Sequence, residues 1–412
     1  MTTKIEVLDA IMGSGKTLGI INWMLSNPQY KYLYISPMLT EVENRIPTDC
    51  AALEFVFPST DEYKTKSEHL LHLLKDGRNI SFSHSLFQDL SKLHLECIQR
   101  EKYILIIDEE VGMIEPYSGT YTKGDITSLE NAKHIEVDED QLGLVRWKWD
   151  TIEENTVYSK LKRQCELEQL YCAKRSREMM VIQLPMSLVQ SAQRTIILTY
   201  LFKGSVMESF LKLKGMEILP FTEVRLIKDT QEVKKQAREL INLKTTPSIK
   251  ALSNLSLSHT WYTTNGKKED YIRIGNAIHS LVRKYSPEDI IFTMPKEALE
   301  RRTKNKKPNP RCAIHKSTNA DTMFLYSAAR ATNDYSNRKV AIHVYNRFVN
   351  RTVMAYLQDY GSELDAVPDD DQFALAEMIQ WIWRTQIRED KPIDLYIVSP
   401  RMKQLFDNWI NS

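Results

Sequence analysis

The sequence lacks the features that mark membrane-spanning proteins, secreted proteins and proteins with structural zinc sites. It contains no run of about 18 apolar residues, so we expect no transmembrane helix and no membrane partner. Its first residues, Met1–Glu6, lack the apolar core of a signal peptide. The five cysteines form no C-x-x-C pair and have no zinc-type spacing. We therefore expect reduced thiols and a cytoplasmic protein.

The chain also has almost no net charge, because 55 basic residues oppose 54 acidic ones. Global charge therefore argues neither for nor against nucleic-acid binding. A basic, turn-rich stretch at 301–311 could contact a phosphate backbone, and a solvated loop is the alternative. The acidic stretch 363–371 is expected to cap the helix that follows it. With 412 residues and ordinary composition, the chain has room for two or three globular domains.

The chain begins with the pattern of a phosphate-binding loop. An apolar run at 5–8 precedes Ala10-Ile-Met-Gly-Ser-Gly-Lys-Thr17, and an amphipathic segment follows at 18–25. In such a loop backbone N–H groups cradle phosphates, the lysine reaches the β- and γ-phosphates, and the Thr17 hydroxyl ligates Mg²⁺. Ala10 replaces the first glycine of the general pattern, as in helicase-type loops. The predicted nucleotide-binding residues are Gly13, Ser14, Gly15, Lys16 and Thr17.

A second motif supports ATP hydrolysis. The continuous apolar run 103–107 has the length of a buried strand and ends in Asp108-Glu109-Glu110. A carboxylate at the tip of such a strand suits Mg²⁺, so Asp108 and Thr17 are the predicted metal ligands. Glu109 can accept a proton from the water that attacks the γ-phosphate. Lys16, Asp108 and Glu109 are therefore predicted to be catalytic.

Apolar runs alternate with helical patterns along the chain, which predicts parallel sheets covered on both faces. The first domain is expected at 1–225, with an insertion at about 111–190, and the second at 226–412. The expected strands are 4–8, 31–35, 53–57, 79–83, 103–107, 195–200, 289–294, 312–315, 339–345 and 394–398. The expected helices are 17–25, 66–75, 86–98, 151–175, 266–284, 350–359, 371–388 and 400–410.

Two further constellations stand out. Gln380, Arg384 and Arg388 recur every four residues, so on a helix they would share one face, and the arginines could stabilise γ-phosphate charge as arginine fingers. We therefore predict that these three residues are catalytic. The alternative is a solvated basic face. In the insertion, Trp147 and Trp149 would point to one face of a strand. They could stack on bases or split a duplex, but we favour the interpretation that they anchor the insertion.

The ordered motifs resemble those of superfamily 2 helicases and translocases, most of all the compact phage- and virus-encoded members. Residues 10–17 are similar to motif I, 108–110 to motif II, 34–45 to motif Ia, 198–201 to motif III, 291–296 to motif IV, 329–335 to motif V and 380–388 to motif VI. Residues 80–86 stand where a further nucleic-acid-contacting motif does. Two positions depart from the pattern: Tyr200 replaces the usual alanine of motif III, and Arg388 stands one residue beyond the usual second arginine of motif VI. The resemblance covers most of the chain outside 111–190.

The resemblance implies an α/β protein with two RecA-like parallel-sheet domains in tandem, an insertion in the first, and ATP and Mg²⁺ as cofactors. ATP rather than another nucleotide is implied by the resemblance alone, since no adenine-reading glutamine precedes the loop. Single-stranded nucleic acid would cross both domains, and Thr199 would couple it to the nucleotide. The implied nucleic-acid contacts are Ser36, Thr40, Arg45, Ser83, His84, Thr293, Lys296, Thr332 and Asn333.

These observations favour an ATP-hydrolysing DNA helicase or translocase of phage or mobile-element replication or recombination, acting in the bacterial host cytoplasm. Single-stranded DNA is the favoured partner, RNA is an alternative, and replication proteins are further candidate partners. One rival is a viral DNA-packaging motor ATPase, which needs a carboxylate-rich nuclease domain after the ATPase. Another is a nucleotide-switched origin-binding or adaptor protein that uses 111–190 for recognition.

Overall fold

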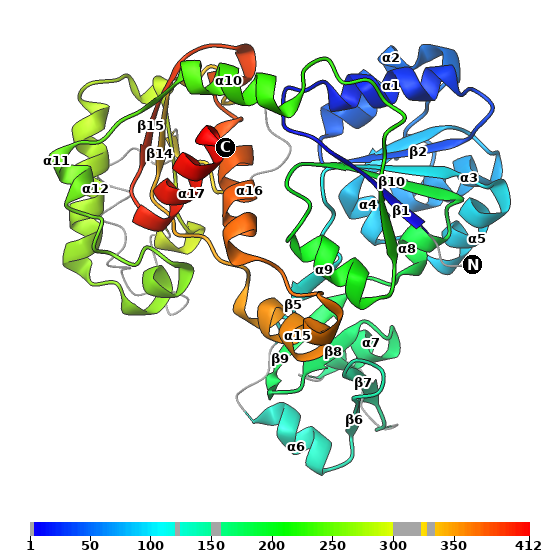
Figure 1. The fold of residues 1–412 in the computed structure, drawn as a ribbon. Coiled ribbons are helices and arrows are strands. Elements are labelled where there is room, and N and C mark those ends of the chain that lie inside the picture. The colour runs from blue at the N-terminus through cyan, green and yellow to red at the C-terminus, as the bar shows by residue number, and fades with distance from the viewer. Residues whose placement is uncertain (1–3, 120–123, 150–157, 300–322, 328–333) are drawn as a thin grey trace. The chain divides into compact units, whose positions relative to one another are not determined.

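The computed structural model describes residues 4–119, 124–149, 158–299, 323–327 and 334–412 (Figure 1). Contacts within the chain divide it into two compact units. The first comprises Met1–Asp9, Lys16–Arg225 and Val349–Asp369, and the second comprises Ala10–Gly15, Leu226–Phe348 and Asp370–Ser412. Across the described ranges, no helix is both long and apolar enough to cross a membrane.

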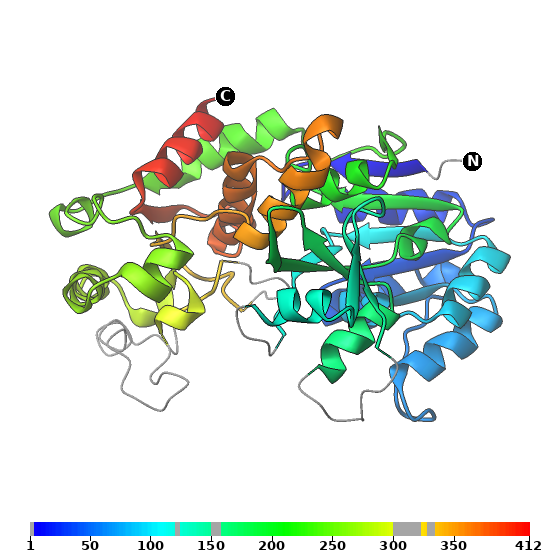
Figure 2. The same ribbon diagram turned by 90° about the horizontal axis from the view of Figure 1, so that it is seen from below.

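The first unit is built on a six-stranded sheet, sheet A, in which every pairing is parallel. Its strands, in spatial order, are β11 (Glu217–Pro220), β1 (Lys4–Asp9), β10 (Arg194–Thr199), β4 (Ile104–Asp108), β2 (Tyr32–Ser36) and β3 (Ile80–Ser83). The central strands are continuous apolar runs because helices cover both faces (Figure 2). This confirms the predicted parallel α/β architecture.

The helices around sheet A are close to those expected, with two differences. They are α1 (Lys16–Ser26), α2 (Ile46–Asp49), α3 (Lys66–Lys75), α4 (His84–Gln88), α5 (Lys92–Glu101), α8 (Ser187–Gln190) and α9 (Val206–Leu213). The expected helix 86–98 is split because Ser91 and His94 form a capping box that starts α5. The expected strand 53–57 is also wrong: Ala51–Leu53 is a 3₁₀ turn, and Val56 makes only an isolated bridge to Ile80.

The insertion forms a five-stranded antiparallel sheet, sheet B, with its own apolar core. Its strands, in spatial order, are β5 (Ile114–Pro116), β9 (Ser176–Gln183), β8 (Leu170–Ala173), β7 (Leu144–Trp147) and β6 (Ile135–Asp138), with α6 (Asp125–Asn131) and α7 (Ser159–Glu166) beside them. The expected helix 151–175 is wrong beyond Glu166. Glu168 adopts a left-handed φ of 53°, and buried Leu170 and Cys172 then alternate along β8 in the period of a strand.

The two tryptophans of the insertion are not neighbours on one strand face. β7 ends at Trp147, which packs against the sheet B core. Trp149 lies beyond the strand and stacks on His134, with ring centroids 4.1 Å apart, and on Trp147, with centroids 6.3 Å apart. The pair therefore contributes to packing within the insertion.

A helix from the second half of the sequence belongs to the first unit. Helix α15 (Arg351–Gly361) packs against β8, β9 and α9. Its Tyr356 hydroxyl donates to the Leu142 carbonyl at 2.8 Å, and Arg175 Nε donates to Asp359 at 2.7 Å. These contacts place Val349–Asp369 with the first unit, whereas the sequence-based division assigned all of 226–412 to the second domain.

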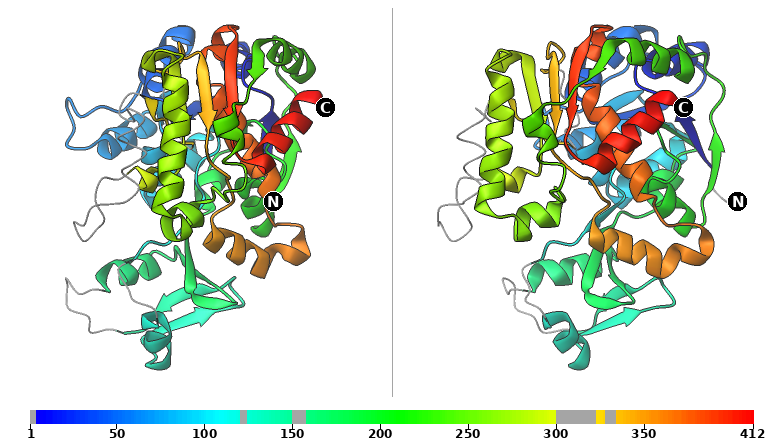
Figure 3. Two further views of the ribbon diagram at one scale, coloured as in Figure 1. Left: turned by 90° about the vertical axis from the view of Figure 1, so that its left-hand side faces the viewer. Right: turned by 60° about the vertical axis from the view of Figure 1, so that its left-hand side comes forward.

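The second unit is built on a smaller parallel sheet, sheet C. Its strands, in spatial order, are β12 (Ile241–Leu243), β15 (Ile393–Ile397), β14 (Val340–His343) and β13 (Ile290–Thr293). Figure 3 shows α12 (Lys268–Val282) on one face, with α16 (Asp370–Ile382) and α17 (Pro400–Asn411) on the other. Helices α10 (Thr230–Leu240) and α11 (Pro247–Lys250) complete the unit, and the expected strand 312–315 lies outside the described residues.

One core residue of this unit is a buried ionisable group. His343, at the end of β14, is fully buried, and neither ring nitrogen has a hydrogen-bond partner among the described residues. Burial, with a smaller effect from Arg347, lowers the pKa of His343 from 6.5 to about 3. The folded protein therefore holds this imidazole neutral at a pH where the unfolded chain would protonate it.

His343 should make the second unit acid-sensitive. Between about pH 7 and about pH 5 the unfolded chain gains a proton that the folded site refuses, which lowers the free energy of unfolding by about 2 kcal/mol. Urea unfolding at several pH values should show this loss in the wild type and a shallower pH dependence in His343→Leu. Equal pH slopes in the two proteins would contradict the assignment.

Candidate nucleotide-binding site

The loop between β1 and α1 has the backbone that a phosphate cradle needs. Gly13 and Gly15 adopt φ of 82° and 89°, the left-handed region that favours glycine. Ser14 between them is fully buried, and its hydroxyl donates to the Ile11 carbonyl at 2.7 Å. A side chain at position 15 would meet Ile227 at 2.8 Å. Because Lys16 then begins α1, the loop presents backbone N–H groups next to a helix N-terminus.

The register of sheet A brings the P-loop, the Asp108–Glu110 motif and the segment similar to motif III to one edge of the sheet. Asp9, the residue before the loop, lies opposite Thr199 of β10, and Leu198 lies opposite Asp108 of β4. The carboxyl ends of parallel strands form the binding edge of such sheets. Thr199 Oγ1 also donates to Glu110 Oε1 at 3.3 Å, so motif III contacts the acidic motif directly.

Burial and mutual repulsion shape the charges at this edge. The pKa of Lys16 is lowered to about 8 by burial, against the opposing effect of Asp108, Glu109 and Asp9. The pKa of Asp108 is raised to about 7, first by burial and then by Glu109 and Glu41. The site therefore concentrates carboxylates around one lysine, an arrangement that a divalent cation would relieve.

Glu109 has a strained backbone at the same edge. Its φ is 64°, which is uncommon for a residue with a side chain, and its N–H donates to the Leu198 carbonyl at 2.9 Å. This bond continues the pairing of β4 with β10 beyond Asp108. Glu109 is therefore held at a fixed position immediately after the strand.

The donor set fits Mg²⁺ shared with a nucleotide. Mg²⁺ keeps several waters and takes one or two protein oxygens together with phosphates. Two protein oxygens are suitable: the Thr17 hydroxyl, in the first turn of α1, and the Asp108 carboxylate, at the end of β4. Helix α1 follows β1, and β1 and β4 both end at the carboxyl edge of sheet A. In the part of the chain that the structure describes, no group of three or more His, Cys, Asp or Glu side chains could hold a metal ion.

Three candidate nucleic-acid contacts of the first unit lie near one another at the ends of β2 and β3. Ser36 donates to Asp108 Oδ2 at 3.4 Å, and the His84 ring nitrogen Nε2 lies 2.9 Å from the Asp108 carbonyl oxygen. Ser83 caps α4 by accepting the Leu86 N–H. Ser36, Ser83 and His84 therefore gather next to the acidic motif.

The remaining candidates of both units are less uniform. Thr40 is exposed, while Arg45 donates to Glu41 at 3.0 Å and to Asp49 at 3.3 Å. In the second unit, Thr293 is fully buried at the end of β13 and Lys296 is exposed. Thr332 and Asn333, like the basic stretch 301–311, lie outside the described residues.

The predicted helix through motif VI is wrong after residue 382. Helix α16 carries Gln380 but ends at Ile382, and a separate 3₁₀ turn spans Gln386–Glu389. Thr385 caps this turn, and the Gln386 N–H bonds to the Arg338 carbonyl at 3.0 Å instead of continuing the helix. Gln380, Arg384 and Arg388 therefore do not share one helical face.

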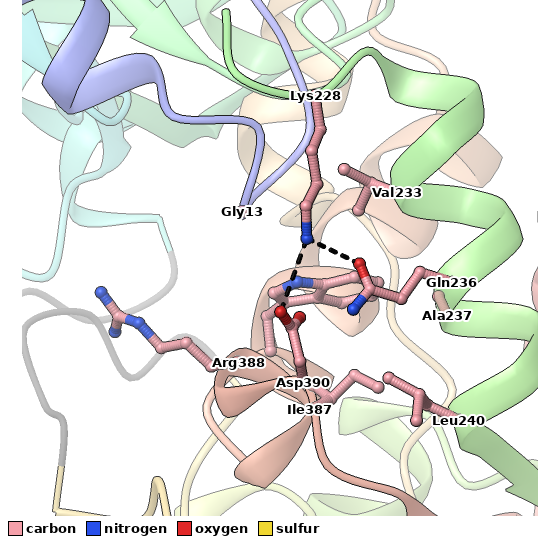
Figure 4. A pocket seen from close by; sticks show the side chains of 10 residues that line it. Gly13, Lys228, Val233, Gln236, Ala237, Leu240, Ile387, Arg388 and Asp390 are labelled. Carbon is pink, nitrogen blue, oxygen red and sulfur yellow. Dashed lines mark hydrogen bonds and ion pairs between the residues drawn. The ribbon is translucent and has the colours of Figure 1, made fainter.

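The break gives the two arginines different environments. Arg384 is buried, with 7% of its surface exposed, whereas Arg388 is exposed. Arg388 also lines a pocket within the second unit, together with Gly13 of the P-loop (Figure 4). The other polar and aromatic side chains that line this pocket are Lys228, Gln236, Trp383 and Asp390.

Sequence reasoning missed Lys228, Gln236, Trp383 and Asp390 as pocket residues. They come from the segment before α10, from α10 itself and from the chain after α16, which no single motif joins. Apolar residues of α10 complete the wall. The one available signal was the position of Lys228 at the boundary expected near residue 225.

The fold is similar to that of a solved structure of XPD in its apo form. The match covers 99% of this chain and 95% of that chain, with a TM-score of 0.52 at 12% identity. Two RecA-like domains in tandem are thus confirmed as the architecture. At this identity the match establishes the fold.

The sequence is similar to that of a prophage-derived protein. The chain is 27% identical to the SPbeta prophage-derived uncharacterized protein YonV of Bacillus subtilis (strain 168), over 99% of both chains. Residues 235–410 match the family model of the YonV C-terminal Rossmann-like domain. This match covers sheet C and the helices around it.

Proposed function

We propose that this protein is an ATP-hydrolysing helicase or translocase that moves along single-stranded nucleic acid. The observation that carries the proposal is the carboxyl edge of sheet A. There the P-loop follows β1, Asp9 of β1 lies opposite Thr199 of β10, and Leu198 of β10 lies opposite Asp108 of β4, so the loop and the acidic motif begin at the same edge. Burial shifts the pKa values of Lys16 and Asp108, and the attraction between these two groups opposes both shifts. A helicase fold and a P-loop with left-handed glycines support the same conclusion.

Each residue at this edge has a chemical role in hydrolysis. Backbone N–H groups of Gly13–Lys16 bind the phosphates, and the Lys16 ammonium neutralises charge on the β- and γ-phosphates. Thr17 and Asp108 would hold Mg²⁺, which neutralises phosphate charge when bound. Glu109 would accept the proton of the attacking water, and Thr199 connects the acidic motif to β10 through Glu110.

DNA is the favoured track, and phage or mobile-element replication or recombination is the proposed setting. The similarity to a prophage-derived protein supports that setting and, with it, the bacterial host cytoplasm. Ser36, Ser83 and His84 beside the acidic motif would contact the strand from the first unit, and Lys296 from the second. Replication proteins are the proposed partners.

Steady-state ATPase assays test this function directly. Turnover would be measured with no polymer, single-stranded DNA, duplex DNA and single-stranded RNA, each beside a Glu109→Gln control. We expect strong stimulation by single-stranded DNA that the Glu109→Gln protein lacks. Turnover that ignores every polymer would instead favour an adaptor role, with sheet B as the recognition module, because that sheet has a core of its own.

A further inference from the structure

The pocket beside the P-loop is lined by a lysine, Lys228, that has no role in the hydrolysis proposed above. The backbone of Lys228 is fixed to the loop tip: its N–H donates to the Ser14 carbonyl at 3.3 Å, and the Ile227 N–H donates to the same oxygen at 2.9 Å. Ile227 also occupies the space beside Gly15. Residues 227 and 228 therefore clamp the tip of the phosphate-binding loop.

The side chain of Lys228 extends into the pocket toward two partners (Figure 4). Its ammonium donates to Gln236 Oε1 at 2.8 Å and pairs with an Asp390 oxygen at 3.5 Å. The Asp390 side chain is 60% exposed, so this ion pair contributes little on its own. An anion that reached the pocket could therefore replace Asp390 as the partner of Lys228.

The nature of that anion follows from the loop that the pocket adjoins. Gly13, which lines the pocket, belongs to the segment that cradles phosphates in such loops. A cation at the loop tip therefore meets the phosphate chain of a nucleotide rather than its base. An ammonium has three donors, and a terminal phosphate is a stronger acceptor than an exposed carboxylate.

Resting on the function proposed above, we propose that Lys228 contacts the terminal phosphate of ATP and so distinguishes ATP from ADP. Lys228 would exchange Asp390 for the γ-phosphate when ATP binds and return to it when the phosphate leaves. Asp390 follows directly after the Gln386–Glu389 turn that carries Arg388.

The test is nucleotide affinity, measured by titration of fluorescent ATP and ADP analogues in the presence of Mg²⁺. In Lys228→Met we expect ATP affinity to fall about tenfold, the usual effect of losing one charge-assisted hydrogen bond, with ADP affinity within about twofold of wild type. Lys228→Arg should keep the preference for ATP. Asp390→Asn should strengthen ATP binding, because the competing carboxylate charge is gone. Lys235→Met is the matched control, since Lys235 is exposed on the adjoining helix α10.

The outcomes separate this inference from the proposed function. Equal losses of ATP and ADP affinity in Lys228→Met would show that Lys228 only supports the loop, and unchanged affinities would show that it does not contact nucleotide. Either result overturns the inference and leaves the hydrolysis proposal standing. Wild-type protein that binds neither nucleotide would overturn both. Melting temperatures of each variant without nucleotide identify any variant that loses affinity through misfolding, and Lys228→Arg then decides the question.

Discussion

Replacing Lys16 with alanine is expected to lower ATP turnover by about 1,000-fold, to near background. Removing one preorganised group that stabilises transition-state charge has effects of this order, and Lys16 interacts with the Asp108, Glu109 and Asp9 carboxylates at the carboxyl edge of sheet A. The measurement is steady-state ATPase at saturating single-stranded DNA. Lys92→Ala is the matched control because Lys92 also begins a helix, α5, but is exposed.

The same variant tests the assignment of the loop. Lys92→Ala should turn over like wild type, and the melting temperature of Lys16→Ala should stay close to wild type because removing a partly desolvated ammonium does not disrupt the core. Residual turnover above about a tenth of wild type in Lys16→Ala would mean that phosphate charge is neutralised elsewhere. The P-loop assignment would then be wrong.

Replacing Arg388 with alanine is expected to leave ATP binding intact and to lower turnover by about 1,000-fold, the effect of removing an arginine finger. Arg388 is exposed and is one of the residues that line the pocket together with Gly13, so it is the arginine of this segment that solvent can reach. Turnover and nucleotide affinity would be measured together. Lys391→Ala, an exposed cation three residues further along, is the control.

Arg384→Ala separates the two arginines. If Arg384 is the arginine finger, this change should spare ATP binding and slow hydrolysis by orders of magnitude. Arg384 is 93% buried, since only 7% of its surface is exposed, so its truncation should also lower the melting temperature. Normal turnover in Arg388→Ala, with a folded but inactive Arg384→Ala, would assign the finger to Arg384.

The parts of the site that could be predicted are those fixed by short segments. The P-loop and the run ending in Asp108 each combine a buried strand with its functional residue, so their sequences alone predicted both the strand and its end. Parallel pairing then brought the strand ends to one edge, and the register confirms that Asp9, Thr199 and Asp108 meet there. Local patterns of this kind also predicted the two parallel sheets.

The parts that could not be predicted depend on distant contacts. Residues 373–388 have a helical pattern, but the bond between the Gln386 N–H and the Arg338 carbonyl ends the helix early. Helix α15 has the sequence of any amphipathic helix, and only its bonds to Leu142 and Arg175 reveal where it packs. The Lys228 pocket joins three segments with no common motif.

The assignment of Val349–Asp369 to the first unit means that the protein cannot be divided by a single cut. A fragment ending at Arg225 would lack α15. The faces of β8 and β9 that this helix covers would then be exposed to water and could associate with other copies of the fragment. The complementary fragment would carry α15 without its binding face. Each half is therefore completed by sequence that lies in the other, so neither fragment contains the whole of its unit.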